Sequence, residues 1–228
     1  MVAGYQDQAL TKSHEALTLA QELSHPFSLA YALDFAALLH RLRREEHAAQ
    51  ERAEAAMTLS AEQRFPLWLA MATILRGATL VEQGQGAESM AQMRQGLTVF
   101  RATGAEVGRP YFLALLAEGY GRGGQAEEGL SVLDEALAAV QKTGERWCEA
   151  EIYRLKGEFV FARSSEDYAE TETCFQQAID IACHQQAKSL RRPRHCWRSC
   201  HESIVKLTTT STKRGCRVGR LNYLEPIA

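Results

Sequence analysis

The sequence predicts an all-α solenoid of about four helix-turn-helix units, each about 40 residues long, which is within the range of known repeat folds. Two ladders of small residues carry this prediction. The first ladder recurs at a constant step, at Ala37, Gly77, Ala117 and Gly157. The second keeps the same step at Ala16, Ala56, Gly96 and Ala136, and Ala178 follows after a slightly longer one. A fixed period of roughly 20–50 residues is typical of folds in which each unit stacks on its neighbours.

Large apolar residues around the second ladder indicate helices. The residue after each ladder position is Leu17, Met57, Leu97, Leu137 or Ile179, and apolar residues also dominate three positions before and after. Apolar residues one and three positions from each ladder residue lie along one stripe of a helix, whereas one face of a strand would require every second residue to be apolar. Within a unit the first ladder precedes the second by a constant interval, as from Ala37 to Ala56. This interval fits two helices of about four turns joined by a tight turn.

The elements follow in chain order from this pattern. Prolines 26, 66 and 110 each fall in the first turn of a first helix, where the missing N–H has no intrahelical partner. Glycines such as Gly84 and Gly124 separate paired helices, and a longer turn at 163–167 explains the longer step before Ala178. We expect helices at 5–23, 26–43, 46–60, 66–83, 87–103, 109–122, 125–142, 146–163 and 168–187.

Three regions result from this alignment. Residues 1–24 match the second helix of later units and are predicted to belong to a truncated repeat, and residues 25–188 hold the complete repeats. Residues 189–228 hold 9 of the 26 Lys and Arg but only 2 of the 28 Asp and Glu, without helical periodicity. We expect an irregular or disordered basic tail there. A frameshift in a GC-rich gene would also produce this composition. The genomic DNA would distinguish the two explanations, because a frameshift predicts further repeat-like sequence in the alternative reading frame.

The third unit resembles tetratricopeptide (TPR) repeats, although it lacks their usual proline and is about 40 rather than roughly 34 residues long. Residues 115–124 and 147–158 are similar to the C-terminal helical arrays of bacterial adenylate/guanylate cyclase-like or LuxR-type signalling ATPases. The resemblance covers about residues 5–190 and implies a right-handed superhelix whose first helices line the concave face. The matching positions are Leu113, Leu116, Ala117, Tyr120, Gly124, Gly129, Leu130, Leu133, Ala136 and Leu137.

Several patterns suggest chemistry but lack a required part. The glycine-rich run 119–124 has neither a preceding strand nor a Gly-Lys-Ser/Thr ending, so it predicts a turn between helices. The tail arginines near Trp197 favour solvated charge over a nucleic-acid site. A histidine–cysteine group lacks the second ligand pair of a structural zinc site; its members are Cys183, His184, His195, Cys196, Cys200 and His201. We therefore expect no enzyme activity, no cofactor and no metal.

The predicted function is a non-catalytic protein–protein interaction or scaffold module, as a fragment of a bacterial signalling or transcription-regulatory protein. Its partner is expected to be a protein or peptide segment held in the concave groove. Two alternatives stay open: a regulatory array that senses a small molecule within the superhelix, and a homo-oligomer formed through uncapped repeat ends. The expected groove residues are Tyr31, Asp34, Arg41, Met71, Ile74, Tyr111, Glu118, Arg122, Arg154 and Glu158. For Met71 and Ile74, packing between repeats is an equal alternative.

Charge and hydropathy add expectations about location. The chain has a net charge of −2, no apolar run long enough for a transmembrane helix, and no signal-peptide pattern at its start. We expect a cytoplasmic protein that contacts neither membrane nor nucleic acid. Six cysteines in 228 residues do not make a disulfide scaffold. Cys148, Cys174 and Cys183 are expected to pack as small apolar side chains.

Overall fold

The computed structural model describes residues 6–164 and 168–185, and these residues form nine helices and no strand. The expected all-α fold is confirmed for this part of the chain. The tail from 189 onward lies outside the described residues, with the candidate nucleic-acid residues and with four of the six candidate zinc residues; Cys183 and His184 lie in the last described helix. The helices are α1 (Gln6–Glu22), α2 (Pro26–Leu42), α3 (Glu46–Glu62), α4 (Pro66–Glu82), α5 (Gly86–Ala102), α6 (Arg109–Arg122), α7 (Ala126–Thr143), α8 (Glu149–Arg163) and α9 (Tyr168–His184).

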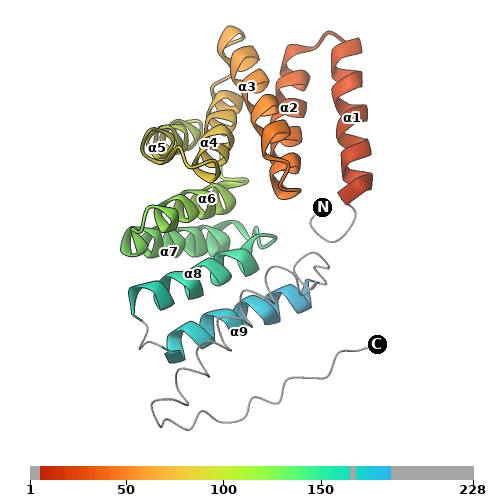
Figure 1. The fold of residues 1–228 in the computed structure, drawn as a ribbon. Helices are drawn as coiled ribbons and strands as arrows, with labels where there is room; N and C mark the ends of the chain where they lie inside the picture. The colour runs from red at the N-terminus through yellow and green to blue at the C-terminus, as the bar shows by residue number, and fades with distance from the viewer. Residues whose placement is uncertain (1–5, 165–167, 186–228) are drawn as a thin grey trace.

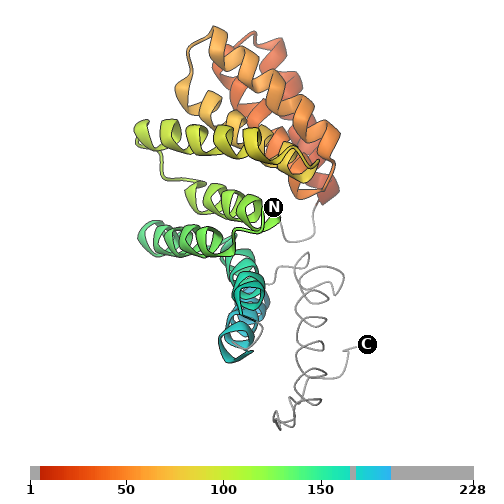
Figure 2. The ribbon, with the colours of Figure 1, turned by 60° about the vertical axis from the view of Figure 1, so that its left-hand side comes forward.

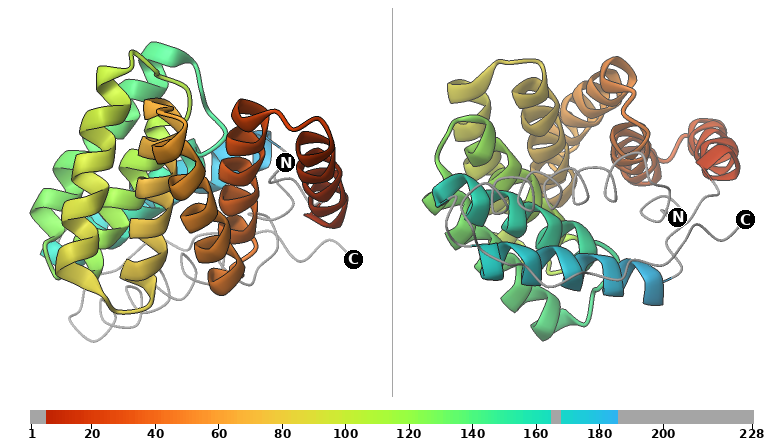
Figure 3. Two further views of the ribbon diagram at one scale, coloured as in Figure 1. Left: turned by 90° about the horizontal axis from the view of Figure 1, so that it is seen from above. Right: turned by 60° about the horizontal axis from the view of Figure 1, so that its bottom comes forward.

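The helices pair as the two ladders predict. α2 packs on α3, α4 on α5, α6 on α7 and α8 on α9. The first helices also contact one another in series, α2 with α4, α4 with α6 and α6 with α8. Figure 1 shows the helices following one another from α1 at one end to α9 at the other, and Figures 2 and 3 show the same order from other sides.

Glycines lie where paired helices approach most closely. A Cβ atom on Gly77 of α4 would lie 2.6 Å from Cγ of Met93 in α5. In return, a Cβ on Gly96 of α5 would lie 2.8 Å from Cγ1 of Ile74 in α4. The alanines of the ladders, Ala37, Ala56, Ala117, Ala136 and Ala178, are buried. Small residues therefore set the distance between paired helices, because any larger side chain would collide with the partner helix.

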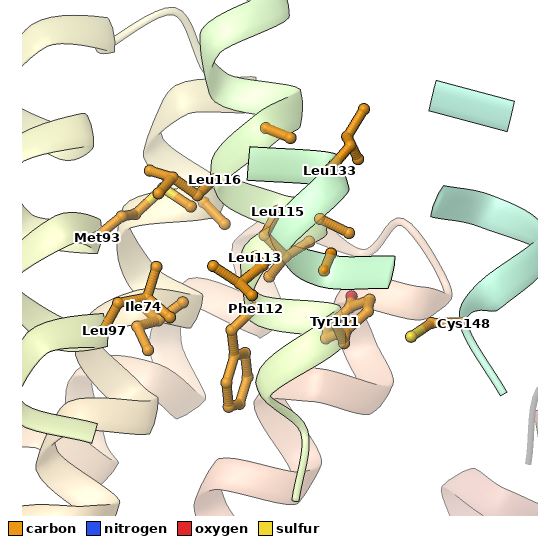
Figure 4. Close-up of a cluster of buried hydrophobic side chains, with 14 of the residues drawn as sticks. Ile74, Met93, Leu97, Tyr111, Phe112, Leu113, Leu115, Leu116, Leu133 and Cys148 are labelled. Carbon is orange, nitrogen blue, oxygen red and sulfur yellow. The ribbon is translucent and has the colours of Figure 1, made fainter. Parts of the chain in front are cut away.

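A continuous core connects the hairpins. Ile74, Met93 and Leu97 from α4 and α5 lie beside Phe112, Leu113 and Leu116 of α6 (Figure 4). Phe159 of α8 lies against Gly121 and Gly129, so that one aromatic ring joins α8 to both α6 and α7. Such contacts between successive hairpins are the means by which stacked units bury apolar surface that a single hairpin leaves exposed.

The turns repeat with the same period as the ladders. Ser24, Arg64, Gly104 and Gly144 each follow a second helix and each have a positive φ, of 51°, 59°, 78° and 74°. This left-handed conformation is the usual way to end a helix, and glycine adopts it without steric cost.

Three local expectations differ from the structure. The eighth helix begins at Glu149 and not at 146, because Glu149 N–H donates to the Arg146 carbonyl in a turn. Ala16 of α1 and Leu23, in the turn after α1, are exposed, since α1 contacts only α2 among the described helices. Cys183 is also exposed, whereas Cys148 and Cys174 are buried as expected.

Candidate interaction surface

One stripe of α2 carries the candidate site. Phe27, Tyr31, Asp34, Leu38 and Arg41 follow the three- and four-residue spacing that places side chains on one face of a helix. The two ends of this stripe differ in character. Its N-terminal end presents aromatic rings to solvent, and its C-terminal end holds a nearly buried arginine.

The N-terminal end forms an aromatic cluster, which we define as Phe27, Tyr31, Phe35, Phe65 and Trp68. The Phe27 ring lies edge-on to Phe65 and to Trp68, at centroid distances of 5.3 and 5.5 Å. The Tyr31 ring also meets Trp68 edge-on, at 5.3 Å. Phe27 and Tyr31 remain 48% and 47% exposed. Edge-to-face packing holds these rings in place while half of their apolar surface stays open to a partner.

The C-terminal end forms an ionic cluster of Arg41, Glu82, Tyr111 and Glu118. Arg41 Nη1 lies 2.8 Å from Glu82 Oε2, and Arg41 Nη2 donates to Glu118 Oε2 at 3.1 Å. These residues come from α2, α4 and α6, so three first helices meet here. Arg122 adds an outer contact, with its Nη2 atom 3.6 Å from Glu118 Oε1.

Burial and charge fix the protonation of this ionic cluster. Burial by itself lowers the pKa of Arg41, but Tyr111, Glu82 and Glu118 outweigh it and raise that pKa above its ordinary value. Burial raises the pKa of Tyr111 to about 12, against the opposing effect of Arg41. At neutral pH, Arg41 is therefore charged and Tyr111 carries its proton.

A second ion-pair group lies on α8. Arg154 donates to Glu151 Oε1 at 2.6 Å and to Glu158 Oε1 at 2.5 Å, one turn before and one turn after it. The Arg154 side chain is largely buried, and these two carboxylates raise its pKa despite the opposing effect of burial. In the same region of the stack, the Tyr111 and Trp147 rings lie 4.9 Å apart and connect α6 with the turn before α8.

The structure therefore separates the ten expected groove residues into two groups. Tyr31 and Arg122 are exposed, and Glu118 and Glu158 are partly exposed. Met71 and Ile74 are buried in the hydrophobic core, so they belong to packing between helices and their assignment to the groove is corrected. Asp34 and Tyr111 are also buried, while Arg41 and Arg154 are mostly covered and engaged with carboxylates.

Sequence reasoning missed Phe27, Trp68, Glu82 and Glu151. Phe27 had a signal in the repeat itself, because the equivalent positions of the later units are also large and apolar: Leu67, Val107 and Trp147. No repeat pattern pointed to Trp68 or Glu82, because the positions equivalent to them in the neighbouring units hold unrelated residues. Only their contacts with Tyr31 and Arg41 reveal them.

The described residues hold no group of three or more His, Cys, Asp or Glu side chains that could bind a metal ion. Burial raises the pKa of the Cys148 thiol to about 12, which disfavours the reactive thiolate. Within the glycine-rich run 119–124, Gly119 packs against Met90, and Gly124 adopts a positive φ in the turn after α6. No helix among the described residues has the length and apolar character needed to cross a bilayer.

Comparison with known proteins supports the fold and leaves the function open. No family model matches the chain. A segment of 113 residues is 31% identical to an uncharacterized protein of Rhizobium meliloti (strain 1021), and it covers 49% of this chain but 11% of that protein. The chain thus spans a small part of that relative's length. The crystal structure of BtubC (BKLC) from P. vanneervenii is similar with a TM-score of 0.60 and 13% identity, over 98% of each chain. At that identity the likeness shows the fold alone, and it places this chain among all-α proteins.

Proposed function

We propose that this chain is a non-catalytic protein-interaction module, a right-handed TPR-like solenoid that holds a protein or peptide segment at the aromatic cluster. Three observations support the solenoid. They are the evenly spaced ladders, the serial contacts of the first helices, and the likeness to BtubC over nearly the whole chain. The relative in Rhizobium meliloti is much longer than the matched segment, which supports a place for this module in a larger bacterial protein. We propose that this larger protein is a signalling protein of the cytoplasm.

The half-exposed rings of Phe27 and Tyr31 carry the proposal. Covering such a patch removes apolar surface from water, which is favourable, and aromatic residues supply a large share of the binding energy at protein interfaces. Trp68 supports both rings from α4, so the patch spans two hairpins and keeps its shape before a partner arrives. A surface formed in advance loses less conformational entropy when it binds.

The ionic cluster supplies charge farther along the same stripe of α2. Arg41 lies beyond Tyr31 on this stripe and is already neutralised by Glu82 and Glu118. Arg122 keeps about half of its side-chain surface exposed and contacts Glu118 at the outer side of the cluster. We assign Arg122 to the polar rim, where a partner's carboxylate would set specificity more than affinity.

A peptide library displayed on phage and selected against the whole chain tests this function. The selected peptide should lose about tenfold or more in affinity for a Phe27→Ala/Tyr31→Ala variant, which corresponds to about 1.4 kcal/mol or more. Tyr31→Phe keeps the ring and should bind almost as wild type does. Val99→Ala removes an exposed apolar side chain from α5 and serves as the matched control.

Far-UV circular dichroism and the urea midpoint of each variant establish that it remains folded. Equal peptide affinity for the wild type and a folded double alanine variant would contradict the proposed site. If a library of small polar and aromatic metabolites yields a saturable ligand while no peptide is selected, the small-molecule alternative takes its place.

A further inference from the structure

Two tyrosine–tryptophan pairs hold equivalent places in the stack. Tyr31 of α2 meets Trp68 at the start of α4 with a centroid distance of 5.3 Å, and Tyr111 of α6 meets Trp147, just before α8, at 4.9 Å. Tyr31 and Tyr111 occupy the same position of their repeats, two units apart. The aromatic cluster contains the first pair, so the second pair is a candidate for a further contact of the same kind.

The Trp147 side chain is fixed by its surroundings and remains partly exposed. Its indole Nε1 donates to Glu145 Oε1 at 2.6 Å, and Glu145 Oε2 accepts from the backbone N–H of Gly108 at 2.8 Å. One carboxylate therefore ties the tryptophan to the turn before α6. Figure 4 shows Tyr111 on α6, on the side of Cys148, the residue that follows Trp147. A ring held in this way can bury its remaining apolar surface with little loss of conformational entropy.

The ionic cluster connects the two pairs. Besides burial, Arg41 and Glu151 both act on the pKa of Tyr111, which places its hydroxyl near them. Arg41 lies on the same stripe of α2 as Tyr31, ten residues farther along. Ten helical residues rise about 15 Å, and the ring contact of the second pair extends the path to roughly 20 Å. We call the side chains from Tyr31 through Arg41 and Tyr111 to Trp147 the binding row. An extended chain spans this length in about six residues.

Carboxylates lie along the binding row and are more exposed than their cations. The side chains of Arg41 and Arg154 are 7% and 15% exposed, whereas the carboxylates that bind them range from 21% at Glu82 to 36% at Glu151. Four carboxylates share these two arginines, so the excess charge is negative even when Arg122 at the outer side is counted. A ligand that follows the row therefore gains from a basic side chain and loses from an acidic one.

We infer that the partner is one extended segment with an apolar residue at each end and a basic residue between them. Its first apolar residue packs on the aromatic cluster, its basic residue meets the carboxylates of the binding row, and its second apolar residue packs on Trp147. This inference rests on the proposed function. It adds a second contact, a length of about six residues and a sign of charge to the partner.

A phage-displayed library of random peptides about twelve residues long, selected against the whole chain, tests the inference. Selected peptides should carry two apolar residues about five to seven positions apart, with Lys or Arg rather than Asp or Glu between them. In fluorescence polarisation, a labelled selected peptide should lose roughly tenfold in affinity for Trp147→Ala. Trp147→Phe keeps an aromatic ring and should lose less, and Val99→Ala, on α5, is the matched control that should lose nothing.

A change in the peptide itself shows which of its residues meets Trp147. Replacing the second apolar residue of the peptide by alanine should weaken its binding to the wild type, and Trp147→Ala should then have little further effect. Circular dichroism and urea midpoints establish that the protein variants are folded. Trp147→Leu, which keeps apolar volume without the ring, takes the place of the alanine variant if that variant unfolds.

The outcomes separate this inference from the function on which it rests. A peptide that needs Phe27 and Tyr31 but binds folded Trp147→Ala as it binds the wild type overturns the inference and leaves the aromatic cluster as the peptide site. Additive effects of the peptide and protein changes also overturn it, as does a selected set rich in Asp or Glu between the apolar residues. A peptide that depends on neither site, or a library that yields none, contradicts both proposals.

Discussion

Arg41 Nη2 lies 3.1 Å from Glu118 Oε2, although α3, α4 and α5 separate the two residues in the chain. The same guanidinium reaches Glu82 at the end of α4. One side chain therefore connects the first helices of three successive hairpins. This connection limits how far α2 and α6 can move apart, and with it the curvature of the face that carries the aromatic cluster.

Replacing Arg41 should destabilise the stack. Arg41→Met removes the cation that Glu82 and Glu118 share and leaves Glu118 only its outer contact with Arg122. Removing one partner of a fully buried pair costs about 3–5 kcal/mol. We expect a smaller loss, because Glu82 and Glu118 keep 21% and 30% of their side-chain surface exposed. Urea unfolding measures this loss of unfolding free energy. Glu118→Gln should lower the unfolding free energy less than Arg41→Met does, since Arg41 keeps its contact with Glu82. The reverse order would contradict the central role of Arg41.

Asp34 should make the stability of the protein depend on pH. It is fully buried, its carboxyl oxygens have no hydrogen-bond partner among the described residues, and burial raises its pKa well above the ordinary value. The folded protein therefore holds this proton more tightly than the unfolded chain does. The contribution of Asp34 to stability is greatest below its unfolded-state pKa, near 4, and is lost as the pH rises towards the folded-state pKa.

Asp34→Asn removes this titration while nearly keeping the shape of the side chain. We expect the variant to be more stable than the wild type at pH 7, because burial raises the pKa of Asp34 and the wild type has lost part of this contribution at that pH. The difference should shrink as the pH falls to 4. Unfolding free energies measured at both pH values test this, and a wild type that is the more stable protein at pH 7 would show that Asp34 has a partner in solution.

Gly157 should not tolerate a methyl group. A Cβ atom there would lie 2.8 Å from Cε1 of Phe175, a fully buried ring of α9. Gly157→Ala should therefore destabilise the protein by about 1–3 kcal/mol, as overpacked cores do. Gly86→Ala is the control, because no atom lies within 4 Å of its added Cβ, and it should be neutral or slightly stabilising.

A second substitution separates overpacking from other effects at Gly157. Phe175→Leu alone should destabilise the protein by leaving a cavity, whereas adding it to Gly157→Ala should cost less than the sum of the two changes. Chemical denaturation of the four proteins in this cycle measures the coupling. Strict additivity would show that Gly157 and Phe175 do not limit the approach of α8 and α9.

The protein should gain stability when Arg64 is replaced by glycine. The φ of Arg64 is 59°, and the equivalent positions of the next two units are Gly104 and Gly144, with φ values of 78° and 74°. An L side chain in this region costs about 1–2 kcal/mol, and the greater freedom of glycine in the unfolded chain offsets part of the gain. We expect Arg64→Gly to raise the thermal midpoint by a few degrees, and Gly104→Arg to lower it.

The positions of the helices could be predicted from the sequence because helical periodicity is local. In each unit the small ladder residue, its apolar neighbours and the residue that ends the helix lie within a few helical turns of one another. Each described helix lies where this pattern indicated one. The ladders also predicted which helices pair. Gly77 and Gly96 are the evidence, since each meets a side chain of the partner helix.

Exposure could not be predicted in the same way, because it depends on neighbours from distant parts of the chain. The helical stripe correctly grouped Tyr31, Asp34 and Arg41, but only tertiary packing left Tyr31 open and buried Asp34. Likewise, nothing near Arg41 in the sequence points to Glu118. The sequence alone thus determined the helices and their pairing through local spacing. Tertiary structure alone decided which faces are covered, because burial depends on what neighbouring hairpins bring into contact.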